Sequence, residues 1–407
     1  MPSPQSPVPN PQSPVPNPQS PNYQFEFRTI SRKFARSLVT SHGIWDTREA
    51  IILRLCDANG NVGWGEIAPI SWFGSENLEQ ALDFCRQLPP KITATTIFSI
   101  PDHLPACQFG FESALEGLGI NQFKIQNSKF KIPEWGLGTG DKGDKGDKGD
   151  KGDKGDKVDK VDSISHTPCP LPPAPYLIPN ARFPMPNLQY SALLPAGEAA
   201  LNQWQTLWQE GYRTFKWKIG VDDISQELQI FDLLIQALPN SAKLRLDANG
   251  GLNYEQAQLW LETCDYWRKH PQSQIEIEFI EQPLAVTDFF QMVALSQSYD
   301  TVIALDESVA TLPQLKTCYE QGWRGIFVIK PAIAGYPSRL RKFCQQYEID
   351  AVFSSVFETA IARFAALKLA AELSHKNRAV GFGINHFFTQ VEDDTWLQNF
   401  FSRTNSP

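Results

Sequence analysis

The stretch Thr214-Phe215-Lys216-Trp217-Lys218-Ile219-Gly220 decides the fold of this 407-residue chain. Successive side chains of a strand point to opposite faces, so its apolar side chains share one face and its two lysines share the other. Unpaired buried charge is costly, and desolvation and a neighbouring ammonium both lower the pKa of a lysine. A lysine tuned in this way can take and return protons near neutral pH. An exposed edge strand with solvated lysines is the alternative, and the stretches downstream decide between the two.

From Tyr190 onward, strands and helices alternate with short connections. This pattern favours a (β/α) barrel. An open doubly wound sheet is the alternative, but no G-x-G-x-x-G fingerprint follows a strand. The predicted strands are Tyr190–Leu194, Thr214–Ile219, Lys243–Asp247, Ile275–Glu281, Thr301–Asp306, Gly325–Ile329, Ala351–Ser355 and Ala379–Phe382.

Charged residues end five consecutive strands of this predicted barrel. Active sites of such barrels form at the C-terminal ends of the strands. Acidic groups end three neighbouring strands, with a lysine on the strand to either side. The charged residues are Lys216 and Lys218, then Arg245 and Asp247, then Glu281, Asp306 and Lys330.

Three carboxylates that converge repel each other unless a cation lies between them. Oxygen ligands with room for water suit Mg²⁺, which can act as a Lewis acid on a substrate carboxylate. A metal and an ammonium together stabilise the charge that develops when a proton next to a carboxylate is removed. Taken singly, Asp247 or Asp306 can instead cap a helix. The sequence Asp-Ala-Asn-Gly also occurs at Asp57, where it predicts a hairpin turn.

The sequence before the barrel predicts three further segments. Residues 1–22 repeat Pro-Asn-Pro-Gln-Ser-Pro-Val and predict a disordered tail, and 23–189 predict an α+β capping domain. Within that domain, about 121–175 read as a disordered insertion that contains Gly-Asp-Lys repeats. Residues 190–383 are then the barrel, and 384–407 form a C-terminal segment that returns to the capping domain. Two loops with exposed aromatics, Thr40–Trp45 and Pro69–Glu76, suggest a lid or an interface.

Composition narrows the function classes. The net charge of -8 argues against nucleic acid as a partner. No apolar run is long enough for a bilayer and no signal peptide is visible, so we expect neither a membrane partner nor export. The seven scattered cysteines indicate reduced thiols in a cytoplasmic protein. The sequence leaves the oligomeric state open.

Five motifs resemble the enolase superfamily in its muconate-lactonising-enzyme-like branch. Within that branch the chain is similar to the o-succinylbenzoate synthase family of cyanobacteria, over about residues 23–395. The stretches that carry this finer likeness are Thr40–Gly43, Gly65–Pro69, Trp72–Gly74, Arg245–Asn249 and Ser354–Thr359. The five motifs are Lys216-Trp217-Lys218, Asp247-Ala248-Asn249, Glu281-Gln282-Pro283, Asp306-Glu307-Ser308 and Lys330-Pro331.

The resemblance implies a fold: a modified TIM barrel, (β/α)7β, under an α+β capping domain. It also implies a reaction, the syn dehydration of 2-succinyl-6-hydroxy-2,4-cyclohexadiene-1-carboxylate to 2-succinylbenzoate in phylloquinone or menaquinone synthesis. The Thr40–Trp45 and Trp72–Gly74 loops would close over the succinyl end of this small carboxylate.

The resemblance assigns roles as well. Asp247, Glu281 and Asp306 would bind Mg²⁺. Lys218 would abstract the α proton and assist hydroxide departure, Lys330 would stabilise the enediolate, and Lys216 would tune Lys218 and orient the carboxylate. Substrate contacts would come from Arg245, Ser354 and Ser355.

Two other functions stay open. The first is an isomerase on the same scaffold, an N-acylamino-acid racemase or a dipeptide epimerase, because lysines on both faces permit two-base chemistry. The second is a non-enzymatic scaffold built around the two low-complexity segments, which the intact lysines and carboxylates disfavour.

Overall fold

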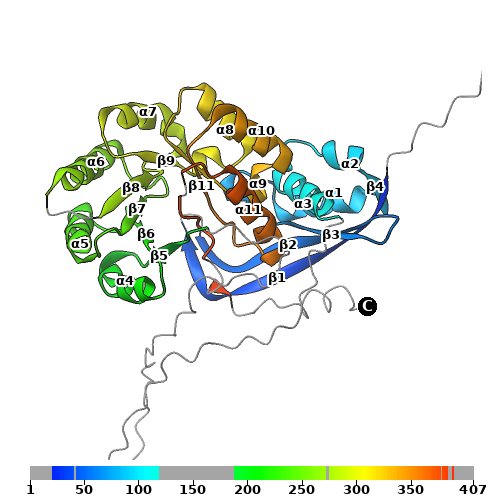
Figure 1. Cartoon of the computed structure of the whole chain (residues 1–407), viewed down its shortest axis with the longest axis horizontal. Coiled ribbons are helices and arrows are strands. Elements are labelled where there is room, and N and C mark those ends of the chain that lie inside the picture. Colours follow the sequence, from blue (N-terminus) through cyan, green and yellow to red (C-terminus); the bar gives the residue numbers. More distant parts are fainter. Residues whose placement is uncertain are drawn as a thin grey trace, which may run out of the picture.

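The computed structural model describes residues 21–40, 43–118, 188–271, 275–376, 378–383 and 387–388. Figure 1 shows an antiparallel sheet with helices at one end of the molecule and a curled parallel sheet surrounded by helices at the other. The expected tail, the Gly-Asp-Lys insertion and most of the expected C-terminal segment lie outside the described residues. Within these ranges, no helix combines the length and apolar character that crossing a membrane requires.

The capping domain is built on a four-stranded antiparallel sheet in the order β3-β2-β1-β4. The predicted Asn-Gly turn joins β2 to β3, and the Asp57 carboxylate accepts hydrogen bonds from the backbone of Asn59 and Asn61 at 2.9 and 2.8 Å. The elements are β1 Asn22–Thr40, β2 Gly43–Cys56, β3 Val62–Ile67, β4 Lys91–Thr93, α1 Leu78–Gln87, α2 Ala94–Phe98 and α3 Pro105–Glu116.

Helix α3 lies unusually close to β3, because glycines replace side chains where they meet. A Cβ atom at Gly65 would lie 2.0 Å from the carbonyl oxygen of Gly110, and one at Gly63 would lie 1.9 Å from that of Ala114. Any side chain at these positions would push the helix away. The close contact fixes β3, whose Glu66 reaches the barrel as described below.

The second domain holds a seven-stranded parallel sheet in the order β11-β10-β9-β8-β7-β6-β5. Figure 1 shows it curled within a ring of helices, as the predicted modified barrel requires. The strands are β5 Ser191–Leu194, β6 Thr214–Lys218, β7 Lys243–Asp247, β8 Glu276–Glu281, β9 Ile303–Leu305, β10 Ile326–Ile329 and β11 Ala351–Phe353. The helices are α4 Ala200–Gln209, α5 Ile224–Ala237, α6 Tyr254–Lys269, α7 Phe289–Ser298, α8 Leu312–Glu320, α9 Pro331–Ala334, α10 Pro337–Tyr347 and α11 Ala360–Leu373. The fold class expected from the sequence is confirmed.

The segment predicted as the eighth strand closes the barrel through single bridges. Val380 pairs with Tyr190, and Gly381 pairs with Ser354, both in parallel orientation. These bridges connect the two edges of the sheet, β5 and β11. The prediction of a strand over Ala379–Phe382 therefore holds for its position, although the described residues form two isolated bridges there instead of a ladder.

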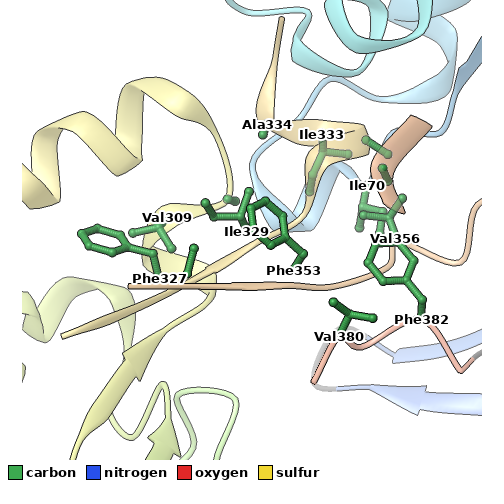
Figure 2. Packing of buried hydrophobic residues seen from close by; sticks show 14 of the residues in the cluster. Ile70, Val309, Phe327, Ile329, Ile333, Ala334, Phe353, Val356, Val380 and Phe382 are labelled. Carbon is green, nitrogen blue, oxygen red and sulfur yellow. The ribbon is translucent and has the colours of Figure 1, made fainter. Parts of the chain in front are cut away.

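One hydrophobic core runs through both domains. Ile70 of the cap and Ile333 of α9 belong to the same cluster as the barrel residues Ile329 and Phe353. Figure 2 shows Ile70 beside Ile333 and Val356, at the junction of the cap loop with the barrel. Because burial of this surface favours a fixed arrangement, the cap is held over the C-terminal ends of β10 and β11.

Candidate active site

Lys216 lies between two of the predicted metal ligands. Its Nζ is 2.7 Å from Asp247 Oδ2 and 2.6 Å from Glu281 Oε1. Strands β6, β7 and β8 are neighbours in the sheet, and their register brings these three strand ends to one level. Burial lowers the pKa of Lys216, but the charges of Asp247, Glu281 and Asp306 outweigh burial, so its pKa is raised. The expectation of a lowered lysine pKa is therefore wrong for Lys216.

The carboxylates of the site carry more charge than their lysine partners neutralise. Asp306 pairs with Lys330, while Asp247 and Glu281 share the single ammonium of Lys216. Burial and the charge of Asp247 raise the pKa of Glu281, and burial also raises the pKa of Asp306. The chemistry of the site therefore favours a further cation.

A fourth carboxylate, Glu307, adds to this excess. It is the residue after Asp306, and burial raises its pKa. One oxygen, Oε1, accepts a hydrogen bond from Asn249 Nδ2 at 3.3 Å. The other, Oε2, is buried without a partner among the described residues. Glu307 lies in the motif Asp306-Glu307-Ser308, but the strand-end pattern alone predicts no role for it in the site.

Gln282 joins the ends of β8 and β9. It is fully buried, and its Oε1 accepts hydrogen bonds from the backbone N–H groups of Asp306 and Ser308 at 3.0 and 3.3 Å. Its Nε2 donates to Ser308 Oγ at 2.8 Å. Gln282 has a φ of 38°, and Asn249 at the end of β7 has a φ of 44°, both in the left-handed region that ordinary residues rarely adopt. Left-handed backbone thus follows two of the candidate ligand carboxylates, Asp247 and Glu281.

The three lysines differ in their partners. Lys216 and Lys330 are held by carboxylates, and Lys330 is buried. Lys218, at the end of β6, is half-buried and forms no ion pair or side-chain hydrogen bond in the part of the chain that the structure describes. Of the three lysines, Lys218 is therefore the one whose ammonium contacts no carboxylate among the described residues.

The loop after β11 carries Ser354 and Ser355. Ser355 Oγ donates to Glu358 Oε2 at 2.7 Å and accepts from the N–H of Phe357 at 2.9 Å. Phe357 has a φ of 62°, so this hydrogen bonding holds a strained turn. Ser354 belongs to the bridge that closes the barrel. Of the two serines, Ser355 already has its hydroxyl engaged.

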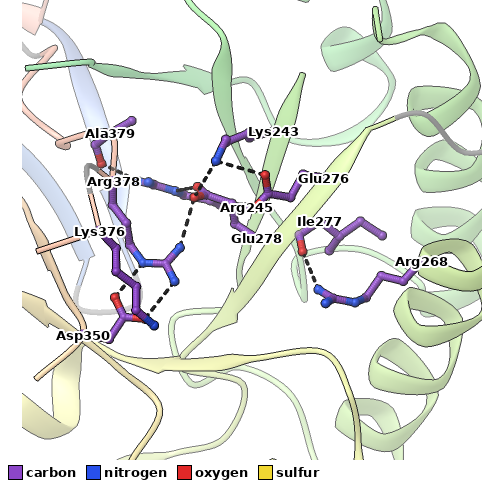
Figure 3. Close-up of polar contacts among 10 residues, drawn as sticks. All are labelled: Lys243, Arg245, Arg268, Glu276, Ile277, Glu278, Asp350, Lys376, Arg378 and Ala379. Atoms are coloured by element: carbon purple, nitrogen blue, oxygen red, sulfur yellow. Dashed lines mark hydrogen bonds and ion pairs between the residues drawn. The ribbon is translucent and has the colours of Figure 1, made fainter. Parts of the chain in front are cut away.

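Arg245 lies deeper in the barrel than the sequence suggested. Its Nε donates to Glu278 Oε2 at 2.6 Å and its Nη1 donates to the carbonyl of Ala379 at 2.8 Å. Figure 3 shows this pair beside Arg378, which bridges Glu278 and Asp350. These contacts tie the closing segment across the barrel, below the level of Asp247 on the same strand. The Nη2 atom is buried without a partner among the described residues.

The cap domain holds the loop after β11 in place. Glu66 accepts from the N–H groups of Thr359 and Ala362 at the start of α11. Arg48 donates to the carbonyl of Val356 at 3.0 Å and to that of Ala68 in the cap at 2.6 Å. Glu66 lies in the stretch Gly65–Pro69 that carries the family resemblance, but no local pattern predicts its contact with α11, and Arg48 lies outside the barrel pattern.

The donor set fits Mg²⁺ in its chemistry. The candidate ligands are buried carboxylates, they exceed their paired lysines in charge, and one neighbouring carboxylate oxygen lacks a partner. In the described residues, however, no group of three His, Cys, Asp or Glu side chains is arranged to hold a metal as it stands. The ammonium groups of Lys216 and Lys330 lie on the ligand oxygens. Metal binding by these candidate carboxylates would require at least Lys216 to move away from Asp247 and Glu281.

Comparison with known proteins gives matches along the chain. Residues 199–401 match the enolase C-terminal domain-like family, and 33–118 match the MenC N-terminal domain family. The o-succinylbenzoate synthase of Thermosynechococcus vestitus is 34% identical over 368 residues, which cover 89% of this chain and 93% of the relative. The L-Ala-D/L-Glu epimerase of Bacillus subtilis is 29% identical over 40% of this chain and 43% of the relative.

Solved structures agree with these matches. The o-succinylbenzoate synthase of Thermosynechococcus elongatus BP-1, a structure with Mg in its active site, superposes with a TM-score of 0.71 at 32% identity, over 94% of this chain and 100% of the other. A substrate-liganded L-Ala-D/L-Glu epimerase from Bacillus subtilis shares the fold, with a TM-score of 0.60 at 18% identity over 90% of each chain. The identity and coverage of the synthase matches place this chain in their family, and it belongs to the o-succinylbenzoate synthases, lyases of the enolase superfamily.

Proposed function

We propose that this chain dehydrates 2-succinyl-6-hydroxy-2,4-cyclohexadiene-1-carboxylate to 2-succinylbenzoate, with Lys218 as the base. The observation that carries this assignment is the contrast among the lysines: Lys216 and Lys330 are paired with carboxylates, and Lys218 is not. A general base must give up its proton before it can take another, and a carboxylate partner opposes that loss.

Lys218 acts twice in this scheme. Its amine removes the proton from the carbon next to the substrate carboxylate. The ammonium so formed then gives that proton to the departing hydroxyl on the same face of the ring, so the carbon–oxygen bond breaks and water leaves. No further acid is needed, because the proton taken in the first step is the one returned in the second.

Lys330 has an electrostatic role. Its contact with Asp306 and its burial hold an ammonium across the strand ends from β6, where it faces the charge that develops on the substrate. Lys216 orients the strand-end carboxylates and the substrate carboxylate. Asp247, Glu281 and Asp306 would hold Mg²⁺, which when bound supplies positive charge to the substrate carboxylate.

Three further residues complete the proposed site. Ser354 is our candidate for direct substrate contact. Ser355 and Arg245 act mainly through their contacts with Glu358 and Glu278, which fix the loop after β11 and the barrel interior. We also propose the division into a cap over 23–189, a barrel over 190–383 and a returning C-terminal segment, and a cytoplasmic location.

The assay incubates the purified full chain and Mg²⁺ with the cyclohexadiene substrate and follows the absorbance of the aromatic product. We expect turnover by the unmodified chain and by Lys342→Ala, which changes an exposed lysine on α10. Lys218→Ala should lose turnover by about a thousandfold and still bind Mg²⁺ in calorimetry. Normal turnover by Lys218→Ala would refute the assigned base.

Racemisation is the competing outcome on this scaffold. Two-base chemistry would need a second base on the Lys330 side, where the Lys330 ammonium is engaged in an ion pair with Asp306. Deuterium exchange into N-succinyl amino acids, measured by mass spectrometry, tests this directly. Exchange without any formation of the aromatic product would replace the lyase assignment with an isomerase.

A further inference from the structure

The cap domain contacts Lys330 through an aromatic ring. Lys330 Nζ lies 3.9 Å from the centroid of the Phe73 ring, while the Asp306 carboxylate contacts the same nitrogen. Lys330 is 8% exposed, so these two groups take up much of its surroundings. An ammonium over an aromatic face is attracted by the ring quadrupole, and the attraction is stronger where water is excluded.

Phe73 is held firmly in this position. It ends the short helical turn Ser71–Phe73, and its N–H donates to the carbonyl of Ile70 at 3.0 Å. Gly74 follows with a φ of 104°, and a Cβ there would lie 3.3 Å from Gln314 of α8. The hydroxyl of Ser75 accepts a hydrogen bond from the N–H of Ile70 at 2.7 Å and closes the loop.

The neighbouring tryptophan points to a different partner. The Trp72 ring meets Trp45 edge to face, with centroids 5.0 Å apart, on the β1–β2 side of the cap. Two adjacent aromatic residues of one loop thus have separate contacts. The Trp72 ring packs against a cap residue, and the Phe73 ring contacts a charged group of the barrel.

We propose that Phe73 is a positioning residue for the reaction: its ring face fixes the direction of the Lys330 ammonium against Asp306. The inference rests on the proposed role of Lys330 in stabilising developing charge. Without the ring, the long lysine side chain gains rotamers and water reaches its ammonium. The cap then contributes to the chemical step itself, in addition to covering the substrate.

Graded fluorination of the ring separates this role from packing. Phe73 is replaced in the full chain by phenylalanine carrying one, two or three ring fluorines, which weaken the face potential with little change of shape. We expect kcat to fall stepwise, by about tenfold at three fluorines, with KM nearly unchanged. The same series at Phe98, an exposed residue of α2, should leave kcat unchanged. An unchanged kcat across the fluorinated variants of Phe73 would overturn the proposal.

A second measurement does not depend on turnover. Lys330 is acetylated with limiting acetic anhydride, and its labelling is read by mass spectrometry against Lys342 in the same sample. Phe73→Leu should raise the relative labelling of Lys330 by about tenfold, and Phe73→Trp should restore it toward the unmodified level. Equal labelling in all three proteins would refute the ring contact, whereas absent turnover in the unmodified chain would refute only the proposed reaction.

Discussion

Glu66 of the cap accepts hydrogen bonds from both the N–H of Thr359, at 2.9 Å, and its hydroxyl, at 2.5 Å. Thr359 is the N-cap residue of α11, so a helix of the barrel is capped by a carboxylate of the other domain. A carboxylate at a helix N-terminus satisfies N–H groups and meets the positive end of the helix dipole. This contact joins the two domains directly behind the loop that carries Ser354.

Replacing Glu66 should weaken both domains together. Glu66→Ala leaves buried N–H groups of Thr359 and Ala362 without an acceptor, and we expect it to cost about 2–4 kcal/mol of unfolding free energy. Urea unfolding followed by tryptophan fluorescence measures the loss. Glu79→Ala, which removes an exposed carboxylate of α1, is the control and should leave the unfolding free energy nearly unchanged. Equal stability of the two variants would contradict the role of Glu66.

Replacing either member of the Arg245–Glu278 pair alone should lower the free energy of unfolding. Both side chains are buried, and Arg245→Met leaves Glu278 without its 2.6 Å partner. We expect a loss of about 3–5 kcal/mol for Arg245→Met and a smaller loss for the double variant Arg245→Met with Glu278→Met, because neither charge of the buried pair then remains. A double-mutant cycle by urea unfolding gives the coupling. Strictly additive losses would show that the pair is not coupled.

Gln282 should control metal affinity without binding the metal. Gln282→Leu removes the acceptor for the backbone N–H of Asp306 and frees that strand end. Since such supporting residues typically change metal affinity by about 10–100-fold, we expect a loss in that range for Mg²⁺. Calorimetry measures affinity, and circular dichroism confirms the fold. Gln205→Leu, at an exposed position of α4, is the matched control and should bind Mg²⁺ normally.

Lys216 and Mg²⁺ should compete for the same oxygens. The ammonium lies on Asp247 and Glu281, so metal binding must displace it. Lys216→Met removes the competitor, and we expect Mg²⁺ to bind about tenfold more tightly while turnover falls. Calorimetry measures the affinity for Mg²⁺, and the absorbance assay measures turnover. Weaker binding by Lys216→Met would mean that the lysine assists the metal.

The stability of the metal-free chain should fall as pH rises. Burial and the charge of Asp247 raise the pKa of Glu281 from 4.5 to about 8. Between these values the folded chain holds a proton that the unfolded chain has released, so rising pH favours unfolding. Melting temperature measured in EDTA from pH 5 to 9 should show this decline, and Glu281→Gln should make it shallower. Added Mg²⁺ should stabilise the unmodified chain most at the alkaline end.

The strand-end residues could be predicted from the sequence because their signal is local. Alternation puts Lys216 and Lys218 on one strand face, and the barrel rule places Asp247, Glu281 and Asp306 at one end. Their register in the structure agrees: Lys218 pairs with Asp247, and Asp247 pairs with Glu281. The catalytic and ligand roles of these residues remain predictions.

The features that the sequence could not predict depend on how deep a side chain lies in the barrel and on contacts between distant segments. Alternation predicts which face of the strand Arg245 occupies, but not how deep in the barrel its guanidinium lies. The pairing of β7 with β8 shifts register between Leu244 and Arg245. The Arg245 guanidinium contacts Glu278. The raised pKa of Lys216 follows from carboxylates at the ends of other strands. No local pattern places Phe73 of the cap over Lys330, because their chain positions are related only through the docking of the two domains.

The closure of the barrel by Val380 and Gly381 has a consequence for synthesis of the chain. During synthesis, the strand that begins the barrel lacks its closing bridge until residue 380 has been made. Phe34 of the cap likewise lacks its bridge partner until Phe388 has been made. Glu66 meets Thr359 across 293 positions of sequence. Contacts this distant form late and slowly. The ribosome must therefore deliver nearly all of the barrel before the first domain to emerge can take its final place, and a stalled or shortened chain would present an unsealed sheet edge to the chaperones.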